Sequence, residues 1–155
     1  MSAFLLSLVL ASTANAATPA DVKAVTDYMF GRVTSAHYVK PLWMSDWAAA
    51  DTSPVYRIVF VEGGRRYTMQ YSSAMGSSYP ASLDFWERPD GTSGQSTLTT
   101  YADSGLDGTV NFGTGPKNNL YSDTFGKVEG EDNKANWQKE YDDAIAAALR
   151  YYRAK

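Results

Sequence analysis

Residues 55–72 constrain the fold of this chain more than any other stretch, because they read as two strands joined by a tight turn. The segment VYRIVFVEGGRRYTMQYS is rich in β-branched and aromatic residues, and it carries two glycines at its centre. Two adjacent glycines accept the positive φ angles that a two-residue primed turn requires. We therefore predict a β-hairpin with Gly63 and Gly64 as its loop.

A two-residue loop also decides which side chains face each other across the hairpin. One face should carry a salt bridge near the turn and three apolar or aromatic pairs, namely Glu62–Arg65, Phe60–Tyr67, Ile58–Met69 and Tyr56–Tyr71. The pairs on the other face are mixed, namely Val61–Arg66, Val59–Thr68 and Arg57–Gln70. We expect the first face to pack on a core and the second to be partly solvated.

A helix is expected on each side of this β region. The first begins at the stretch TPAD (18–21), which combines a capping hydroxyl, a proline at the first helical position and an acid in the first turn. Its apolar stripe consists of Val22, Val25, Met29, Phe30 and Val33. The second begins after Gly130, and its stripe consists of Trp137, Tyr141, Ile145, Ala148, Leu149 and Tyr152.

Further strands are expected between the two helices. Residues 83–88 alternate in character and are followed by the turn Pro89-Asp90-Gly91, with a return strand over 96–101. Short strands are expected at 109–112 and within 113–130. This order predicts an α+β fold, in which an antiparallel meander sheet of about four to six strands has the N-terminal and the C-terminal helix packed on one face.

The first sixteen residues, MSAFLLSLVLASTANA, follow the pattern of a secretory signal peptide. Their apolar run is shorter than the roughly 20 residues of a membrane span, and Ala14-Asn15-Ala16 is a small-residue cleavage site, although no Lys or Arg precedes the run. We expect cleavage after Ala16, a single globular α+β domain over 17–155, and a secreted or periplasmic location. The alternative is a buried N-terminal helix or an uncleaved anchor.

Composition excludes several classes of function. The chain has no cysteine, so it has no disulfide, no thiol nucleophile and no cysteine-bound zinc. Its formal net charge is −3 and its basic residues are scattered, which argues against a nucleic-acid partner. Aromatic residues make up 14% of the chain, and we expect many of them in the core.

The segment DSGLDGTVN (103–111) resembles part of a calcium-binding loop of the EF-hand type. Asp103, Asp107 and Asn111 match ligand positions, but Gly105 brings no oxygen at the third position and Thr114 cannot replace the bidentate glutamate. Asp-x-Gly and Asp-Gly are also common where a chain simply turns. A pair of turns is the favoured interpretation, and a calcium site is the alternative; no other cofactor is expected.

Catalytic patterns are weak, and we predict no catalytic residue. His37 is the only histidine, and no G-x-S-x-G stretch supplies a nucleophile for it. Asp84 and Glu87 flank two aromatic residues, but alternate strand residues point to opposite faces. A small secreted hydrolase that uses carboxylates or His37 stays open as an alternative, and it requires at least two of Asp46, Asp84, Glu87 and His37 to converge.

Exposed aromatic residues indicate binding instead. Trp43 and Trp47 lie between the first helix and the first strand, and Trp86 lies in the second hairpin. Tryptophans in such places form platforms for sugar rings or apolar partners, although large aromatics are more often simply packed. The predicted function is a non-catalytic binding or structural module of the cell envelope or extracellular space, with a small molecule, glycan or protein as its partner.

Overall fold

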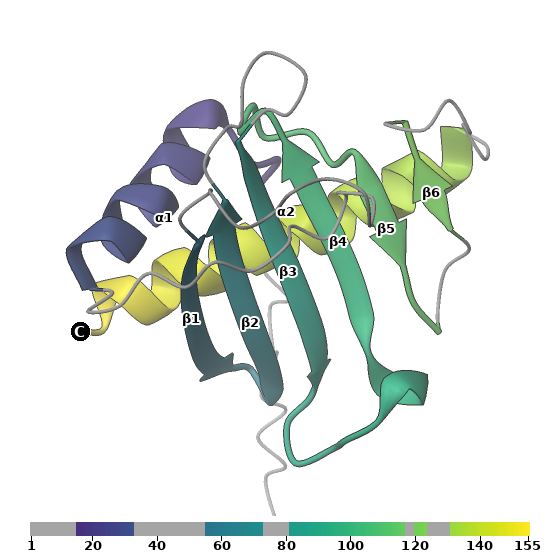
Figure 1. Cartoon of the computed structure of the whole chain (residues 1–155), viewed down its shortest axis with the longest axis horizontal. Helices are drawn as coiled ribbons and strands as arrows, with labels where there is room; N and C mark the ends of the chain where they lie inside the picture. Colours follow the sequence, from purple (N-terminus) through teal and green to yellow (C-terminus); the bar gives the residue numbers. More distant parts are fainter. Residues whose placement is uncertain (1–14, 33–54, 73–80, 117–119, 124–130) are drawn as a thin grey trace, which may run out of the picture.

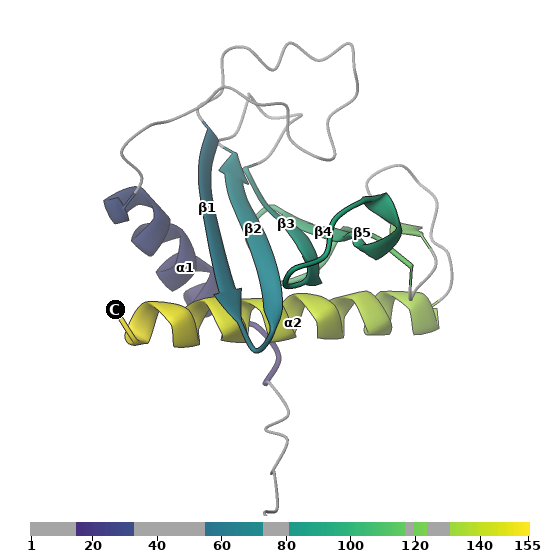
Figure 2. The ribbon, with the colours of Figure 1, turned by 90° about the horizontal axis from the view of Figure 1, so that it is seen from below.

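The computed structural model describes residues 15–32, 55–72, 81–116, 120–123 and 131–155. In chain order the elements are α1 (Pro19–Arg32), β1 (Val55–Glu62), β2 (Arg65–Ser72), β3 (Ser82–Pro89), the short 3-10 helix η2 (Gln95–Thr97), β4 (Thr99–Ser104), β5 (Phe112–Thr114), β6 (Tyr121–Ser122) and α2 (Glu131–Arg153). The strands form one antiparallel sheet in the order β1 to β6, and both helices lie on the same face of it (Figure 1, Figure 2). The predicted α+β meander is confirmed.

The β1–β2 hairpin has the predicted register throughout. Gly63 and Gly64 form the turn with φ angles of 58° and 73°, and every predicted pair is observed, from Glu62 opposite Arg65 to Tyr56 opposite Tyr71. A slip by one residue would turn the side chains of one strand to the opposite face from those of its partner. The turn chemistry therefore decides which side chains meet the helices.

The predicted salt bridge between Glu62 and Arg65 is replaced by two longer-range pairs. Glu62 accepts hydrogen bonds from Arg150 of α2, at 2.6 and 3.1 Å, and Arg65 forms an ion pair with Glu87 of β3. Both residues lie on the helix side of the sheet, where α2 and β3 offer them partners. Register alone could not show these partners, because they come from other elements.

The core lies between the sheet and the two helices. Helix α2 runs behind the strands, and α1 packs beside it near the β1 edge (Figure 1). Tyr28 of α1 stacks on Tyr152 of α2, with ring centroids 3.6 Å apart. The fully buried large side chains on this side of the sheet are Trp137, Tyr101, Tyr121, Tyr141, Phe85, Met29, Met69, Leu83, Ile145, Val22 and Val25. Much of the core is therefore aromatic, as the composition predicts, and each large apolar side chain buried there stabilises the fold by about 1.5–3 kcal/mol.

Helix α1 begins where the capping pattern predicts. The Thr18 hydroxyl accepts a hydrogen bond from the backbone N–H of Asp21 (3.2 Å), and the Asp21 carboxylate accepts one from the backbone N–H of Thr18 (3.0 Å). This reciprocal arrangement satisfies two backbone donors at the helix start. Phe30, which the helical stripe places in the core, is 45% exposed and packs edge-on against Tyr56 and Tyr71 instead.

Two strand boundaries differ from the sequence prediction. The return strand begins at Thr99, because residues 95–97 form η2 with a hydrogen bond from Leu98 N to Gln95 O (3.1 Å). The strand expected at 109–112 begins only at Phe112. Val110 is buried, but its backbone N–H donates to the Gln138 side chain of α2 (2.9 Å) rather than to a neighbouring strand.

Of the helices in the described part of the chain, neither is long and apolar enough to cross a membrane.

Replacing Gly113 with alanine should destabilise the fold strongly. A Cβ at Gly113 would overlap ring carbons of Trp137, the side chain by which α2 packs on β5. Overpacking of a core typically costs about 1–3 kcal/mol, and here both neighbours are fixed, so we expect at least the upper end of that range. Urea denaturation followed by far-UV circular dichroism measures the loss.

Gly115→Ala is the matched control for this prediction. Its Cβ would meet the Thr99 side chain at 3.0–3.1 Å, a contact that a small shift relieves. We expect a clearly smaller loss than for Gly113→Ala. Equal unfolding free energies for the two variants would contradict the packing of Trp137 on β5.

Candidate functional site

The two faces of the sheet have different characters. Strand alternation places the apolar and aromatic residues on the face that the helices cover. The opposite face, which we call the open face, carries Arg57, Gln70, Asp84, Ala102 and Phe112 in one cross-strand row. The next row toward the β1–β2 turn contains Val59, Thr68, Trp86, Thr100 and Thr114. Most of the polar chemistry of the strands is therefore gathered on the open face.

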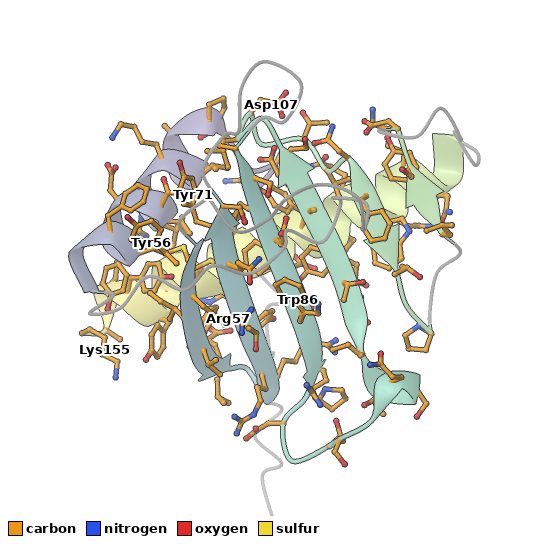
Figure 3. The ribbon with its side chains drawn as sticks, in the orientation of Figure 1. Tyr56, Arg57, Tyr71, Trp86, Asp107 and Lys155 are labelled. Atoms are coloured by element: carbon orange, nitrogen blue, oxygen red, sulfur yellow. The ribbon has the colours of Figure 1, made fainter. Side chains whose placement is uncertain are left out.

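The middle of the open face is buried, although the sequence predicts a partly solvated face there. Gln70, Ser72, Ser82 and Asp84 are all 0% exposed. The Gln70 side-chain oxygen accepts a hydrogen bond of 2.6 Å from Arg57 Nη2. Because Gln70 is buried in β2, this bond holds the Arg57 guanidinium against the sheet. Figure 3 shows Arg57 and Trp86 on the side of the sheet opposite α2.

Arg66, Arg88 and Trp86 lie toward the turn end of the open face, and Arg57 lies on the same face one cross-strand row beyond Trp86. Arg66 of β2 stands directly opposite Arg88 of β3, and Trp86 and Arg57 are on the same face. Two large apolar side chains of β1 border them, Val59 at 50% and Val61 at 43% exposed. We call these residues, Arg57, Val59, Val61, Arg66, Trp86 and Arg88, the arginine–tryptophan patch.

The charges of this patch are only partly balanced. Arg66 Nε lies 3.2 Å from an Asp90 carboxylate oxygen, and both side chains are well exposed. Within the described residues, no carboxylate lies within ion-pair distance of Arg57 or Arg88. Like charges directly opposite each other on neighbouring strands destabilise a sheet. An anion bound between Arg66 and Arg88 would remove that repulsion.

The predicted binding residues are only partly placed by the structure. Trp86 lies in the arginine–tryptophan patch and is half-buried, whereas Trp43 and Trp47 lie outside the described residues. The three arginines were not predicted as site residues. The alternation of β3 already places Arg88 on the same face as Trp86, and the hairpin register adds Arg57 and Arg66. The pairing of β2 with β3, which joins the two sets, is not readable from local sequence.

The residues proposed for hydrolysis do not converge where the structure describes them. Asp84 lies on the open face and Glu87 on the helix side. Glu87 is 3% exposed, pairs with Arg65, and accepts a hydrogen bond of 2.6 Å from the Tyr101 hydroxyl. Burial raises the pKa of Tyr101 well above its usual 10, so this hydroxyl stays a donor. His37 and Asp46 lie outside the described residues.

The loop over residues 103–111 is held by hydrogen bonds to its own carboxylates. The buried Asp103 carboxylate accepts the Tyr141 hydroxyl (2.7 Å) and the backbone N–H groups of Gly108 (3.0 Å) and Asp107 (3.3 Å). Asp107 accepts Thr109 N–H at 2.8 Å. The Asn111 side-chain oxygen accepts Ser104 N–H at 2.6 Å. The three side chains predicted as calcium ligands thus have hydrogen-bonding partners in the chain itself, as turn-forming residues do.

A metal site finds no other support in the described ranges, where no group of three or more His, Cys, Asp or Glu side chains could hold an ion. Burial raises the pKa of Asp103 above its usual 3.8, and the hydrogen bonds from Tyr141 and Gly108 oppose that shift. The Asp103 carboxylate is therefore surrounded by hydrogen-bond donors, where a metal-binding carboxylate would contact the ion. The loop geometry is that of a closed turn fastened to α2.

Cavities among the described residues lie on both sides of the sheet, and the second of the two described next borders the arginine–tryptophan patch, because Thr100 is the cross-strand partner of Trp86. One, of about 400 Å³, lies between the N-terminal segment and α2, and its lining includes Ala17, Asp21, Asp142, Arg150 and Arg153. The other, of about 300 Å³, lies at the end of the sheet beside η2 and is lined by small or polar residues such as Ser96, Thr100 and Thr114. Neither brings together an acid, a base and a nucleophile.

Tyr141→Phe should destabilise the fold in a pH-dependent way. In the wild-type protein, the hydrogen bond from Tyr141 favours the ionised form of Asp103. Hydrogen bonds to charged groups contribute about 1.5–3 kcal/mol to the free energy of unfolding. Without it the pKa of Asp103 rises further. The loss of unfolding free energy is therefore largest at pH values well above the pKa of Asp103, and it becomes smaller as the pH falls through that pKa. Denaturation at several pH values measures this trend.

Tyr151→Phe is the control for this variant, because it removes a hydroxyl from the same helix and keeps the ring that stacks on Phe60. Its effect should be small at every pH. A loss for Tyr141→Phe that does not vary with pH would contradict the bond to an ionised Asp103.

Calcium should leave the thermal unfolding midpoint unchanged. An ion that binds only the folded state must raise the midpoint, but the oxygens of Asp103, Asp107 and Asn111 already accept hydrogen bonds. Melting curves recorded with calcium chloride and with EGTA test this expectation. A higher midpoint with calcium would restore the calcium-site alternative.

Comparison of this chain with protein-family models, with curated protein sequences and with solved structures finds no significant match.

Proposed function

We propose that this chain is an exported binding protein that recognises an anionic glycan through the arginine–tryptophan patch. Export is supported by the leader pattern of residues 1–16. The observation that carries the proposed ligand is the direct cross-strand pairing of Arg66 with Arg88 on the open face, beside Trp86. The helices cover the other face of the same sheet, and the exposed part of the open face, around Arg66, Val59 and Val61, is the sheet surface that supports the proposal.

Charge complementarity favours an anionic ligand. The chain as a whole has a formal charge of −3, yet three guanidinium groups lie on this one surface. A guanidinium binds a carboxylate through two parallel hydrogen bonds, which a planar acid group of a sugar can accept. The bond from Arg57 to the buried Gln70 limits the conformations of that side chain. A ligand therefore meets at least one arginine that is already ordered, which reduces the entropy cost of binding.

The aromatic and apolar members of the patch favour a ring-containing ligand over a simple anion. Trp86 offers an amphipathic ring to a sugar face, and Val59 and Val61 add exposed apolar surface along β1. Small-molecule sites typically combine such apolar contacts with a few placed polar groups. A polymer of uronic acids presents both a pyranose face and a carboxylate in each repeat.

A binding role is favoured over hydrolysis by the placement of the acids. Glycoside hydrolysis uses two carboxyl groups that flank one bond. Asp84 and Glu87 lie on opposite faces of β3, and Glu87 is committed to Arg65 and Tyr101. The patch supplies cations and an aromatic ring but no pair of acids.

The protein should bind polygalacturonate and not neutral dextran. We expect Arg57→Gln and Arg88→Gln each to weaken binding about tenfold, the effect of losing about 1.4 kcal/mol. Trp86→Ala should weaken it about threefold to tenfold by removing the stacking contact. Added salt should weaken binding as well, because exposed charges are screened. Isothermal titration calorimetry measures all four effects.

Arg153→Gln is the matched control, since it makes the same change at an exposed arginine of α2, on the other side of the sheet. It should leave the affinity unchanged. Equal binding of dextran and polygalacturonate, or equal losses for Arg57→Gln and Arg153→Gln, would contradict the proposal. Release of reducing ends from the polymer would instead favour the hydrolase alternative.

A further inference from the structure

The start of the described chain is tied to α2 by one hydrogen bond. The backbone N–H of Ala17 donates to the Asp142 carboxylate at 2.9 Å. The same Asp142 oxygen accepts a bond of 2.9 Å from the Gln138 side-chain nitrogen. Gln138 in turn donates to Gly108 O (2.8 Å) and accepts from Val110 N–H (2.9 Å). Ala17 therefore joins a network that links α2 with the loop before β5.

Packing also singles out Ala17. A Cβ placed on Gly108 would lie 2.8 Å from the Ala17 carbonyl oxygen, so the two backbones are in close contact. The two residues before it, Asn15 and Ala16, are exposed, whereas Ala17 is half-buried. The anchored part of the chain thus begins at the residue that follows the predicted cleavage site Ala14-Asn15-Ala16.

We propose that a leader-removing peptidase hydrolyses the bond between Ala16 and Ala17, and that the new α-ammonium group of Ala17 binds Asp142. Water adds across the amide: the C–N bond breaks, Ala16 leaves as a carboxylate, and the Ala17 nitrogen becomes an amine. With an ordinary pKa of about 7.7–8.0, that amine is largely protonated at neutral pH. This proposal is independent of the ligand proposed above.

Cleavage strengthens a contact that already exists. The nitrogen that donates to Asp142 as a neutral amide would donate to the same oxygen as a cation. Charge-assisted hydrogen bonds are roughly twice as strong as neutral ones. Removal of Asn15 and Ala16 also opens the cavity of about 400 Å³ that they line together with Ala17, Asp21 and Asp142. The mature N-terminus would therefore pair with Asp142 at the edge of this cavity.

The first test is the identity of the mature N-terminus. The full-length chain is expressed in a bacterium with an intact export system, and the exported product is examined by N-terminal sequencing and intact mass. We expect a chain that begins with Ala17. A product that begins at any other residue, or that keeps the leader, would overturn the proposal.

The second test separates the ion pair from an ordinary hydrogen bond. Asp142→Asn is made in the exported, processed protein and in the leader-retaining protein recovered from the cytoplasm. We expect the melting temperature to fall in both, and by about 3–5 °C more in the processed form, where a charged pair is lost. Equal losses in the two forms would overturn the proposal.

A control variant shows whether the effect is specific to Asp142, and a second measurement replaces the variant if it does not fold. Asp143→Asn breaks the exposed ion pair with Lys139 one residue further along α2 and should act equally in both forms. If Asp142→Asn does not fold, selective acetylation of the Ala17 amine in the processed wild-type protein replaces it. Acetylation should lower the melting temperature by about the same 3–5 °C, and an unchanged melting temperature would overturn the proposal.

Discussion

The register of the β1–β2 hairpin is the constraint on which the rest of the structure depends. With Gly63 and Gly64 in the turn, Phe60 and Met69 face the helices, and Arg57 and Arg66 face away from them. A slip of one residue turns over one strand relative to the other, and it would move either Arg57 or Arg66 toward the core beside Trp137, where burial of an unpaired charge is very costly. The same two glycines thus select the core and the composition of the open face.

The features that the sequence predicts correctly are those that depend on residues close together in the chain. Hairpin register, helix starts and the helical stripes depend on neighbours within a few residues, and they are observed except at Phe30, which is exposed, and at Val33, which lies outside the described residues. The partners of Glu62 and Arg65 are Arg150 and Glu87, which come from other elements and leave no local trace. The arginine–tryptophan patch is intermediate, because each strand places its own residues on the open face but only the β2–β3 pairing brings Arg66 opposite Arg88.

The loop at 103–111 shows why a motif must be judged by what its atoms contact. A carboxylate that binds calcium keeps its oxygens for the ion. Here Asp103 is buried under Tyr141, and its oxygens accept one hydroxyl and two backbone N–H groups. The residue types that suit a cation also suit a closed turn, because both need oxygen acceptors at short spacing. Gly105 and Thr114 stand at positions where a calcium loop has oxygen ligands, so the sequence alone already favours the turn.

The two faces of the sheet differ in role, because one packs on the helices and the other does not. Both proposals concern polar groups outside the apolar core, namely the Ala17 nitrogen with Asp142 and the arginines of the open face. On the helix side every strand contributes to packing, and the N-terminal segment is drawn into that side by Asp142, Gln138 and Gly108. An ammonium group formed at Ala17 would add a charged contact between the first and last elements of the fold, which are the most distant in sequence. The proposed ligand site, with its arginines and Trp86, lies on the other face of the sheet, which the two helices do not cover. On these two proposals, mutations on the helix side change stability and mutations on the open face change ligand binding.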